Sequence, residues 1–209
     1  MPLPVLHSFA GYSIYRAFHT DGKRLSWRLA FLSIFLANLA DFDFLPGLFT
    51  DVVGKYHRGI THSVGAALIC AFLITFVAWS AKRISFWRNF FLCFFAYLSH
   101  VVLDFFTLEG SWMPILWPLS SARFNPPFVF FGGVADGVNS SAGRGIFFTS
   151  LVSQATVTRL IFETSVVAFI LLSVKGASVL RNRFPTREAV AAVGIAAFLL
   201  IWALTALAR

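Results

Sequence analysis

The sequence predicts an all-α, polytopic integral membrane protein with about five to six transmembrane helices and one long interfacial loop. Apolar residues make up 58% of the 209 residues and charged residues 12%, and the mean hydropathy is +0.77. This balance is typical of membrane proteins, and the 26 phenylalanines and six tryptophans suit lipid-facing helices and interfacial belts. The length favours a single domain over residues 1–209.

Six apolar segments account for the predicted helices, and the clearer ones approach the ~20 residues that a bilayer core requires. They cover residues 2–18, 29–49, 61–81, 86–106, 159–174 and 189–208. The first and fifth are shorter and more polar, and the second is interrupted near its end by Pro46-Gly47. Residues 107–158 form the long connection, whose aromatic content indicates a loop on the membrane surface. The N-terminus lacks a charged region before a cleavage site, so we expect no cleaved signal peptide.

Ten of the 17 lysines and arginines lie in the short connections after segments one, three and five. These are Lys23, Arg24, Arg28, Lys82, Arg83, Arg88, Lys175, Arg181, Arg183 and Arg187. Because cytoplasmic loops carry an excess of cations, we expect both termini outside the cytoplasm. The net charge of +8 could suggest nucleic-acid binding, but no basic amphipathic face is visible, so no nucleic-acid partner is expected.

Seven histidines and acids fall at the ends of apolar segments, where an unpaired ionisable group costs several kcal/mol. They are His7, Asp41, Asp43, His57, His62, His100 and Asp104. At ~1.5 Å per helical residue, Asp43 and His100 both lie ~21 Å from the cytoplasmic start of their helices. The other five fall near the same depth, so the sequence predicts one layer of polar side chains in the outer leaflet. Neutral imidazoles with carboxylates are typical ligands of a divalent metal.

The fourth segment contains His100 and Asp104, which are one helical turn apart and differ by only ~40° around the helix. Both side chains can therefore reach one metal or two adjacent ones. The alternative is a His–Asp hydrogen bond that stabilises the helix end. His7 by itself is weak evidence for a metal site, because a satisfied polar residue on a short helix explains it equally well. The argument for His7 rests on its predicted depth in the membrane, which agrees with that of the other candidates.

The string H-R-G-I-T-H places His57 and His62 five residues apart, which is ~140° on a regular helix. Gly59 therefore indicates that His57 lies in a loop and His62 in the first helical turn, with Thr61 as the candidate N-cap. The alternative is a solvated loop with a capping threonine, although two histidines flanking an arginine make an unusual loop.

Asp41 and Asp43 form a D-x-D where the second helix breaks. Two such carboxylates can face different metals, or one can bridge while the other orients a ligand. Solvated acids at a helix end are the alternative, although acids at a C-terminus oppose the macrodipole.

Three further residues are candidates for substrate chemistry. Arg58 and Arg123 can hold an anionic group, such as a phosphate oxygen, although salt bridges to nearby acids would also explain them. Glu109 could act as a general base or an extra ligand, with a solvent-exposed loop acid as the alternative.

The strings L-A-D-F-D (39–43), H-R-G-I-T-H-S (57–63) and Y-L-S-H-V-V-L-D-F-F-T-L-E-G (97–110), with His7, I-L-W-P and R-F, resemble the LexA-regulated inner-membrane family of metal-dependent hydrolases. The resemblance covers about residues 1–130, and Phe44 departs from it where many relatives carry a polar residue, often His. It implies hydrolase chemistry in a bacterial inner membrane. The ligand order also looks like that of the zinc phospholipase C and P1 nuclease families, which cleave phosphoesters.

Together these observations predict a membrane-embedded metal-dependent hydrolase that cleaves a phosphoester of a lipid or lipid-linked substrate at the outer membrane face. We expect two divalent ions, zinc first and manganese or iron as alternatives, with Asp43 bridging or acting as base. A metal transporter or sensor is the main alternative, but transporters place ligands near the midplane, often in repeated halves. An intramembrane metalloprotease would usually need an H-E-x-x-H motif, which the sequence lacks.

Overall fold

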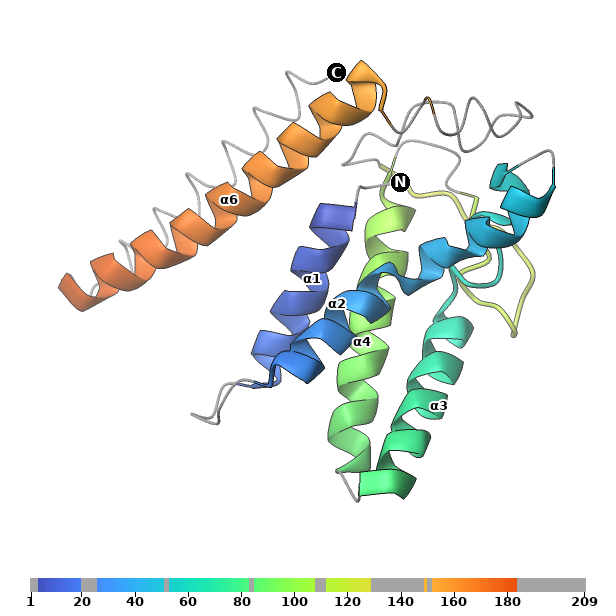
Figure 1. The fold of residues 1–209 in the computed structure, drawn as a ribbon, viewed down its shortest axis with the longest axis horizontal. Coiled ribbons are helices and arrows are strands. Elements are labelled where there is room, and N and C mark those ends of the chain that lie inside the picture. Colours follow the sequence, from blue (N-terminus) through green and yellow to red (C-terminus); the bar gives the residue numbers. More distant parts are fainter. Residues whose placement is uncertain are drawn as a thin grey trace. The chain divides into compact units, whose positions relative to one another are not determined.

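A computed structural model describes residues 4–19, 26–50, 53–82, 85–107, 112–128, 149 and 152–183. These residues are mostly helical and contain no strand beyond one isolated bridge between Met113 and Phe124, which confirms the all-α fold class (Figure 1). The chain divides into two compact units, Met1–Arg159 and Leu160–Arg209. The first unit extends beyond the motif-bearing part at about residues 1–130, and the boundary falls at the start of the fifth predicted segment. The single domain over residues 1–209 stays a prediction.

The first unit is built around α4 (Phe86–Phe105), which packs against three other helices. These are α1 (Pro4–Ala17), α2 (Trp27–Leu39) and α3 (Val64–Lys82). α1 also packs against α2 (Figure 1). Small residues such as Ala67, Ala71 and Ala96 are fully buried in the core, and their size lets the helices approach closely.

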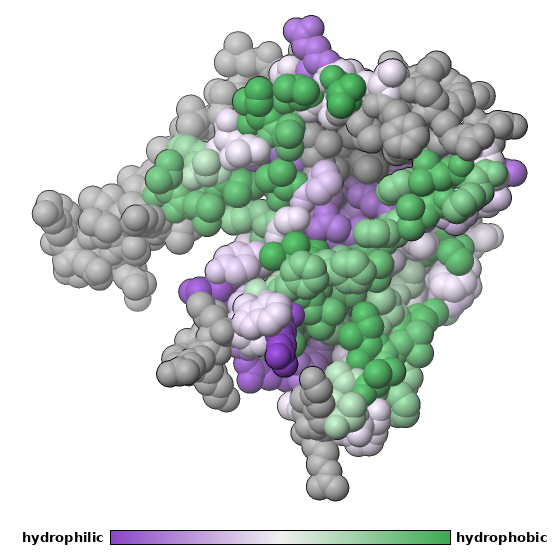
Figure 2. Space-filling view, in the orientation of Figure 1, coloured by the Kyte–Doolittle hydropathy of each residue, from purple (hydrophilic) through white to green (hydrophobic). Residues whose placement is uncertain are grey.

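Four helices in the described part of the chain are long and apolar enough to cross a membrane. They are Trp27–Phe49, Val64–Ala81, Phe86–Phe105 and Gln154–Ser173. The last forms most of α6 (Gln154–Arg183), whose residues from Leu160 onward belong to the second unit. Hydrophobic residues cover much of the visible surface of α2, α3 and α4 (Figure 2). The predicted polytopic architecture is therefore confirmed. The first predicted segment forms α1, whose 14 residues are short for a span, and the sixth lies outside the described residues.

The second apolar segment changes its geometry where the sequence predicted an interruption. α2 ends at Leu39 and continues as the 3-10 helix η1 (Ala40–Phe49), which contains Pro46. Proline removes a backbone donor and clashes with the preceding turn of an α-helix, so the chain cannot continue as a regular α-helix there. Asp41 and Asp43 lie in the first turn of η1, immediately after this change.

The H-R-G-I-T-H-S turn follows the 3-10 helix η2 (Val53–Tyr56) and leads into α3. The Ser63 hydroxyl oxygen accepts a hydrogen bond from the backbone N–H of Ala66 at 3.0 Å, so Ser63 is the N-cap. The predicted cap at Thr61 is wrong, because the Thr61 hydroxyl donates instead to Asp43. His62 consequently lies in the turn before α3 and not in its first helical turn.

A segment of the predicted interfacial loop is docked on the start of α3. The backbone N–H groups of Val64 and Gly65 donate to the carbonyls of Ile115 and Trp117 at 2.9 and 3.1 Å. These bonds satisfy donors that the first turn of a helix leaves unpaired. A Cβ atom on Gly65 would lie 2.1 Å from the Trp117 oxygen, so only glycine allows this approach.

Candidate metal centre

All seven histidines and acids selected from the sequence lie in one cluster of the first unit. α1 contributes His7, η1 contributes Asp41 and Asp43, the H-R-G-I-T-H-S turn contributes His57 and His62, and α4 contributes His100 and Asp104. Four of them, His7, His62, His100 and Asp104, are fully buried, and Asp41 is 8% exposed. Residues almost one hundred positions apart in sequence therefore share a site that solvent barely reaches.

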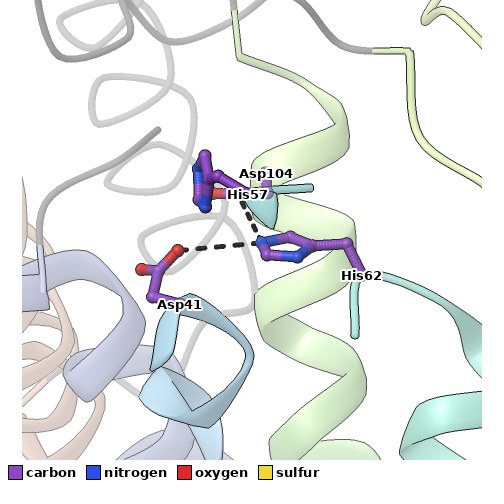
Figure 3. A group of neighbouring side chains, drawn as sticks. All are labelled: Asp41, His57, His62 and Asp104. Atoms are coloured by element: carbon purple, nitrogen blue, oxygen red, sulfur yellow. Dashed lines mark ion pairs between the residues drawn. The ribbon is translucent and has the colours of Figure 1, made fainter. Parts of the chain in front are cut away.

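One set of four side chains, Asp41, His57, His62 and Asp104, offers ligand atoms that all lie within 4.8 Å of one another (Figure 3). His62 is at the centre of this set. Its Nε2 lies 3.7 Å from Asp41 Oδ1 and 3.4 Å from Asp104 Oδ2. Two imidazoles and two carboxylates at this spacing match the donor types and number of a four-coordinate zinc site.

A second set, His7, Asp41 and His100, also offers ligand atoms within 4.8 Å of one another. His100 Nε2 lies 3.5 Å from Asp41 Oδ1, and the rings of His7 and His100 stack with centroids 4.0 Å apart. Asp41 belongs to both sets. Asp104 also reaches both, because its Oδ1 lies 3.4 Å from His7 Nε2 while its Oδ2 faces His62.

Several atoms at the centre of the cluster are buried without a hydrogen-bond partner. They are His7 Nδ1 and Nε2, Asp41 Oδ1, and both carboxylate oxygens of Asp104. Burying such atoms unpaired costs free energy, and a carboxylate costs most because it carries charge. A divalent cation would satisfy the convergent atoms together, so the residues present fit a metal on the chemistry of the donor set. They do not distinguish zinc from manganese or iron.

The Nδ1 nitrogen of His100 contacts a backbone carbonyl of α2. Its Nδ1 lies 2.8 Å from the carbonyl oxygen of Ala37, in the last turn of α2. Since a carbonyl only accepts, Nδ1 carries the proton, and Nε2 keeps a lone pair directed at Asp41 and His62. This is the arrangement that a metal-binding histidine needs.

Asp43 faces the Nδ1 atoms of His57 and His62, whereas Asp41 and Asp104 face Nε2 of His62. Its Oδ1 is 2.9 Å from His57 Nδ1, its Oδ2 is 3.1 Å from His62 Nδ1, and Oδ2 also accepts from the Thr61 hydroxyl at 2.7 Å. It belongs to neither of the two sets of convergent ligand atoms found among the described residues. The sequence predicted a bridging ligand or a base here, and the structure shows a carboxylate occupied by two imidazoles and a hydroxyl.

Arg58 extends the cluster with a buried guanidinium. Its Nε lies 3.6 Å from Asp104 Oδ2 and its Nη2 donates to the Thr107 hydroxyl at 2.8 Å, whereas Nη1 has no hydrogen-bond partner. The backbone of Arg58 has φ of +58°, a left-handed conformation that costs a non-glycine residue energy and that recurs at functional sites. The H-R-G turn is therefore held in a strained shape that brings this guanidinium to the cluster.

The other predicted site residues are not brought into the cluster. Arg123 is exposed and donates from Nη1 to the backbone oxygen of Trp112 in its own loop, so its role in substrate binding stays a prediction. Glu109 lies outside the described residues.

Two residues that the sequence reasoning missed support the cluster. Thr107 joins Arg58 to the end of α4, because its hydroxyl accepts from Arg58 and donates to the Asp104 carbonyl at 2.6 Å. Tyr97 donates from its hydroxyl to the Thr61 carbonyl at 2.9 Å. Tyr97 and Thr107 each lie three residues from a predicted ligand, His100 or Asp104, and that spacing is the signal that could have identified them.

The sequence of the chain is similar to those of known inner-membrane proteins. The sequence model of the family described as YdjM inner membrane protein matches residues 1–208. The chain belongs to this family. The inner membrane protein YbcI of Escherichia coli (strain K12) is 32% identical over 130 residues, which is 61% of this chain and 74% of YbcI. No solved structure matches the chain significantly. Family membership and the apolar helices together make this an integral inner-membrane protein.

Proposed function

We propose that this inner-membrane protein is a metal-dependent hydrolase that cleaves a phosphoester of a lipid or lipid-linked substrate at the outer, periplasmic face of the membrane. The observation that carries the proposal is the buried cluster of four histidines and two acids, whose unpaired donor atoms converge next to an arginine with a free N–H group. Such a cluster in a chain with so few charged residues is expensive to bury unless it has a function.

The two overlapping sets of side chains support two metal ions. His57 and His62 would hold one ion, and His7 and His100 the other. Asp41 would be shared between them, since it belongs to both sets, and Asp104 would face both ions through its two oxygens. Paired ions are common in enzymes that cleave phosphoesters, which favours this activity over single-metal chemistries.

When bound, a divalent metal supplies a nucleophile at neutral pH by lowering the pKa of water to about 7. Arg58 supplies the other requirement, a cation for the anionic group of the substrate. Its Nη1 is buried and unpartnered, and Thr107 holds the opposite side of the guanidinium. Guanidinium binds phosphate oxygens through charge-assisted hydrogen bonds, which are stronger in a site that excludes water.

The membrane provides the remaining support for a lipid substrate. The cluster lies at the ends of apolar helices, and the cation bias of the loops favours a periplasmic position for those ends. The regulation by LexA and the relation to zinc phospholipases that the sequence motifs suggest are parts of this proposal that rest on resemblance.

The decisive experiment is a hydrolysis screen of the purified full chain against vesicles of phospholipids and lipid phosphates, with and without chelator. We expect one or two zinc, manganese or iron ions per chain and metal-dependent release of a phosphate-bearing or dephosphorylated product. A protein that holds no metal after reconstitution would contradict the whole proposal. Metal-dependent uptake of ions into liposomes without hydrolysis would instead indicate a transporter, and cleavage of a membrane peptide would indicate a protease.

A further inference from the structure

We infer that Asp43 is a positioning residue whose single carboxylate fixes two metal-binding histidines, His57 and His62, in one tautomer. The inference deepens the proposed function and rests on it. Each oxygen of Asp43 faces a different ring, Oδ1 to His57 Nδ1 at 2.9 Å and Oδ2 to His62 Nδ1 at 3.1 Å. The carboxyl side chain is only 5% exposed, so water competes little for these contacts.

The tautomer follows from the chemistry of the partners. An ionised carboxylate only accepts hydrogen bonds, so each Nδ1 that faces it carries a proton. A neutral imidazole has one N–H, and both histidines are therefore left with a lone pair on Nε2. For His62 this nitrogen points at Asp41 and Asp104, on the edge of the ring opposite Asp43. A metal bound there lies away from Asp43, which explains why Asp43 is absent from the convergent ligand sets.

The surroundings of Asp43 keep the carboxylate in this role. The Thr61 hydroxyl donates to Oδ2 at 2.7 Å, and Thr61 is itself tied to α4 because its carbonyl accepts from the Tyr97 hydroxyl at 2.9 Å. η1, the H-R-G-I-T-H-S turn and α4 are thus joined through one carboxylate and one threonine. Carboxylates that accept from metal-bound histidines orient the rings and make them better ligands.

The test uses Asp43→Asn, which keeps the size of the side chain. An asparagine oxygen can accept from one Nδ1–H, but its NH2 group would face the other Nδ1–H as a second donor. One histidine must then place its proton on Nε2 and lose its ligand lone pair. We expect zinc affinity, measured by competition with a chromogenic chelator, to fall about 10–100-fold. X-ray absorption of the zinc-loaded variant should show about one nitrogen ligand fewer.

The control is Ser99→Ala. Ser99 is next to His100 on α4, and its hydroxyl donates to the Ala96 carbonyl of the same helix. This variant should keep the zinc affinity and ligand set of the wild type. Thr61→Val removes a hydroxyl that donates to Asp43 Oδ2 and lies 3.1 Å from His62 Nδ1. Because this variant leaves both contacts of Asp43 with the histidines in place, it should give a smaller loss of affinity than Asp43→Asn.

A measurement on the unaltered protein keeps the inference testable if the variant does not fold. Nitrogen-15 NMR of the histidine rings in the zinc-loaded wild type should show His57 and His62 bound through Nε2 with protonated Nδ1. Zinc bound through Nδ1 of either ring, or loss of an oxygen ligand instead of a nitrogen in Asp43→Asn, would overturn the positioning role but not the metal site. A wild type that binds no zinc, manganese or iron would overturn both.

Discussion

At the scale of single residues, Asp104 is the carboxylate that touches the most members of the cluster. It lies within 4 Å of His7, His62, His100 and Arg58, and its side chain is fully buried. Neither of its oxygens has a hydrogen-bond partner. The free energy of this carboxylate therefore depends on the cations and imidazoles around it, which links metal binding to the stability of the fold.

Asp104→Asn should remove metal and destabilise the protein together. The change leaves the buried Arg58 guanidinium without its nearest opposite charge, and removing one partner of a buried ion pair costs about 3–5 kcal/mol. Elemental analysis and thermal unfolding of the detergent-solubilised protein measure the two effects. Ser99→Ala on the same helix is the control, and an unchanged metal content in Asp104→Asn would refute the ligand assignment.

Arg58→Lys should separate substrate binding from metal binding. Lysine keeps the positive charge but lacks the planar fork that places one N–H group on Thr107 and leaves another free. We expect unchanged metal content and a fall of about 100-fold in kcat against the phospholipid that the wild type cleaves best. Equal turnover by the two proteins would exclude Arg58 from the reaction.

At the scale of elements, two glycines set how closely the helices bring the ligands together. A Cβ atom on Gly11 would lie 2.5 Å from the Ser33 oxygen and 2.7 Å from the Ala37 Cβ of α2. Gly11 is one turn after His7 on α1, and Ala37 provides the carbonyl that holds His100. Gly65 plays the same part for α3, at the contact with Trp117.

Gly11→Ala and Gly65→Ala should disturb different halves of the cluster. The first pushes α1 from α2 and displaces His7, whereas the second displaces the start of α3 and the neighbouring His62. Forcing atoms into such packed contacts costs about 1–3 kcal/mol. We expect Gly11→Ala to weaken the binding of one of the two metal ions selectively. A metal titration would then show a fall from two bound ions per chain to one. Equal, small effects of both variants on metal binding would contradict this division.

The sequence predicted the helices well because hydrophobic length is a local property. The segments 61–81 and 86–106 agree with α3 and α4 within a few residues, and the break after the second helix falls at Asp41 as expected. The N-cap was wrong, since Ser63 and not Thr61 caps α3. Thr61 and Ser63 are both good caps, and only the contact with Asp43, 18 residues earlier, decides between them.

At the scale of the whole molecule, the cluster joins parts of the chain that are far apart in sequence. α1, η1, the H-R-G-I-T-H-S turn and α4 each contribute candidate ligands, so a bound metal would tie together most of the first unit. The helices expose large apolar side chains, such as Phe31 and Trp87, whereas this centre joins α1, η1 and α4 through ion pairs between histidines and acids.

Removal of metal should therefore lower the stability of the whole first unit. A ligand that binds only the folded state stabilises it by about 4 kcal/mol at a thousand times its Kd. We expect a chelator to lower Tm in detergent and zinc to restore it, with magnesium as the control cation. A Tm that is independent of chelator and of added zinc would show that the cluster holds no stabilising ion.

The orientation in the membrane is testable with two exposed positions. Lys55→Cys, before the H-R-G-I-T-H-S turn, and Ser85→Cys, between α3 and α4, are each made in a background with Cys70→Ala and Cys93→Ala. An impermeant maleimide added to intact cells should label the first cysteine and spare the second, as the positive loops predict. The reverse pattern would place the cluster on the cytoplasmic side.

The sequence by itself determined the membrane class, the helices and the chemical character of the centre. Apolar length is read along the chain, and the histidines and acids at the ends of apolar segments have few roles other than binding a cation. Only the tertiary structure decided which atoms meet. It placed Asp41 in both ligand sets, Asp43 at the Nδ1 edges of two rings, and Arg123 in its own exposed loop. These outcomes depend on contacts between segments distant in sequence, which no pattern along the chain specifies.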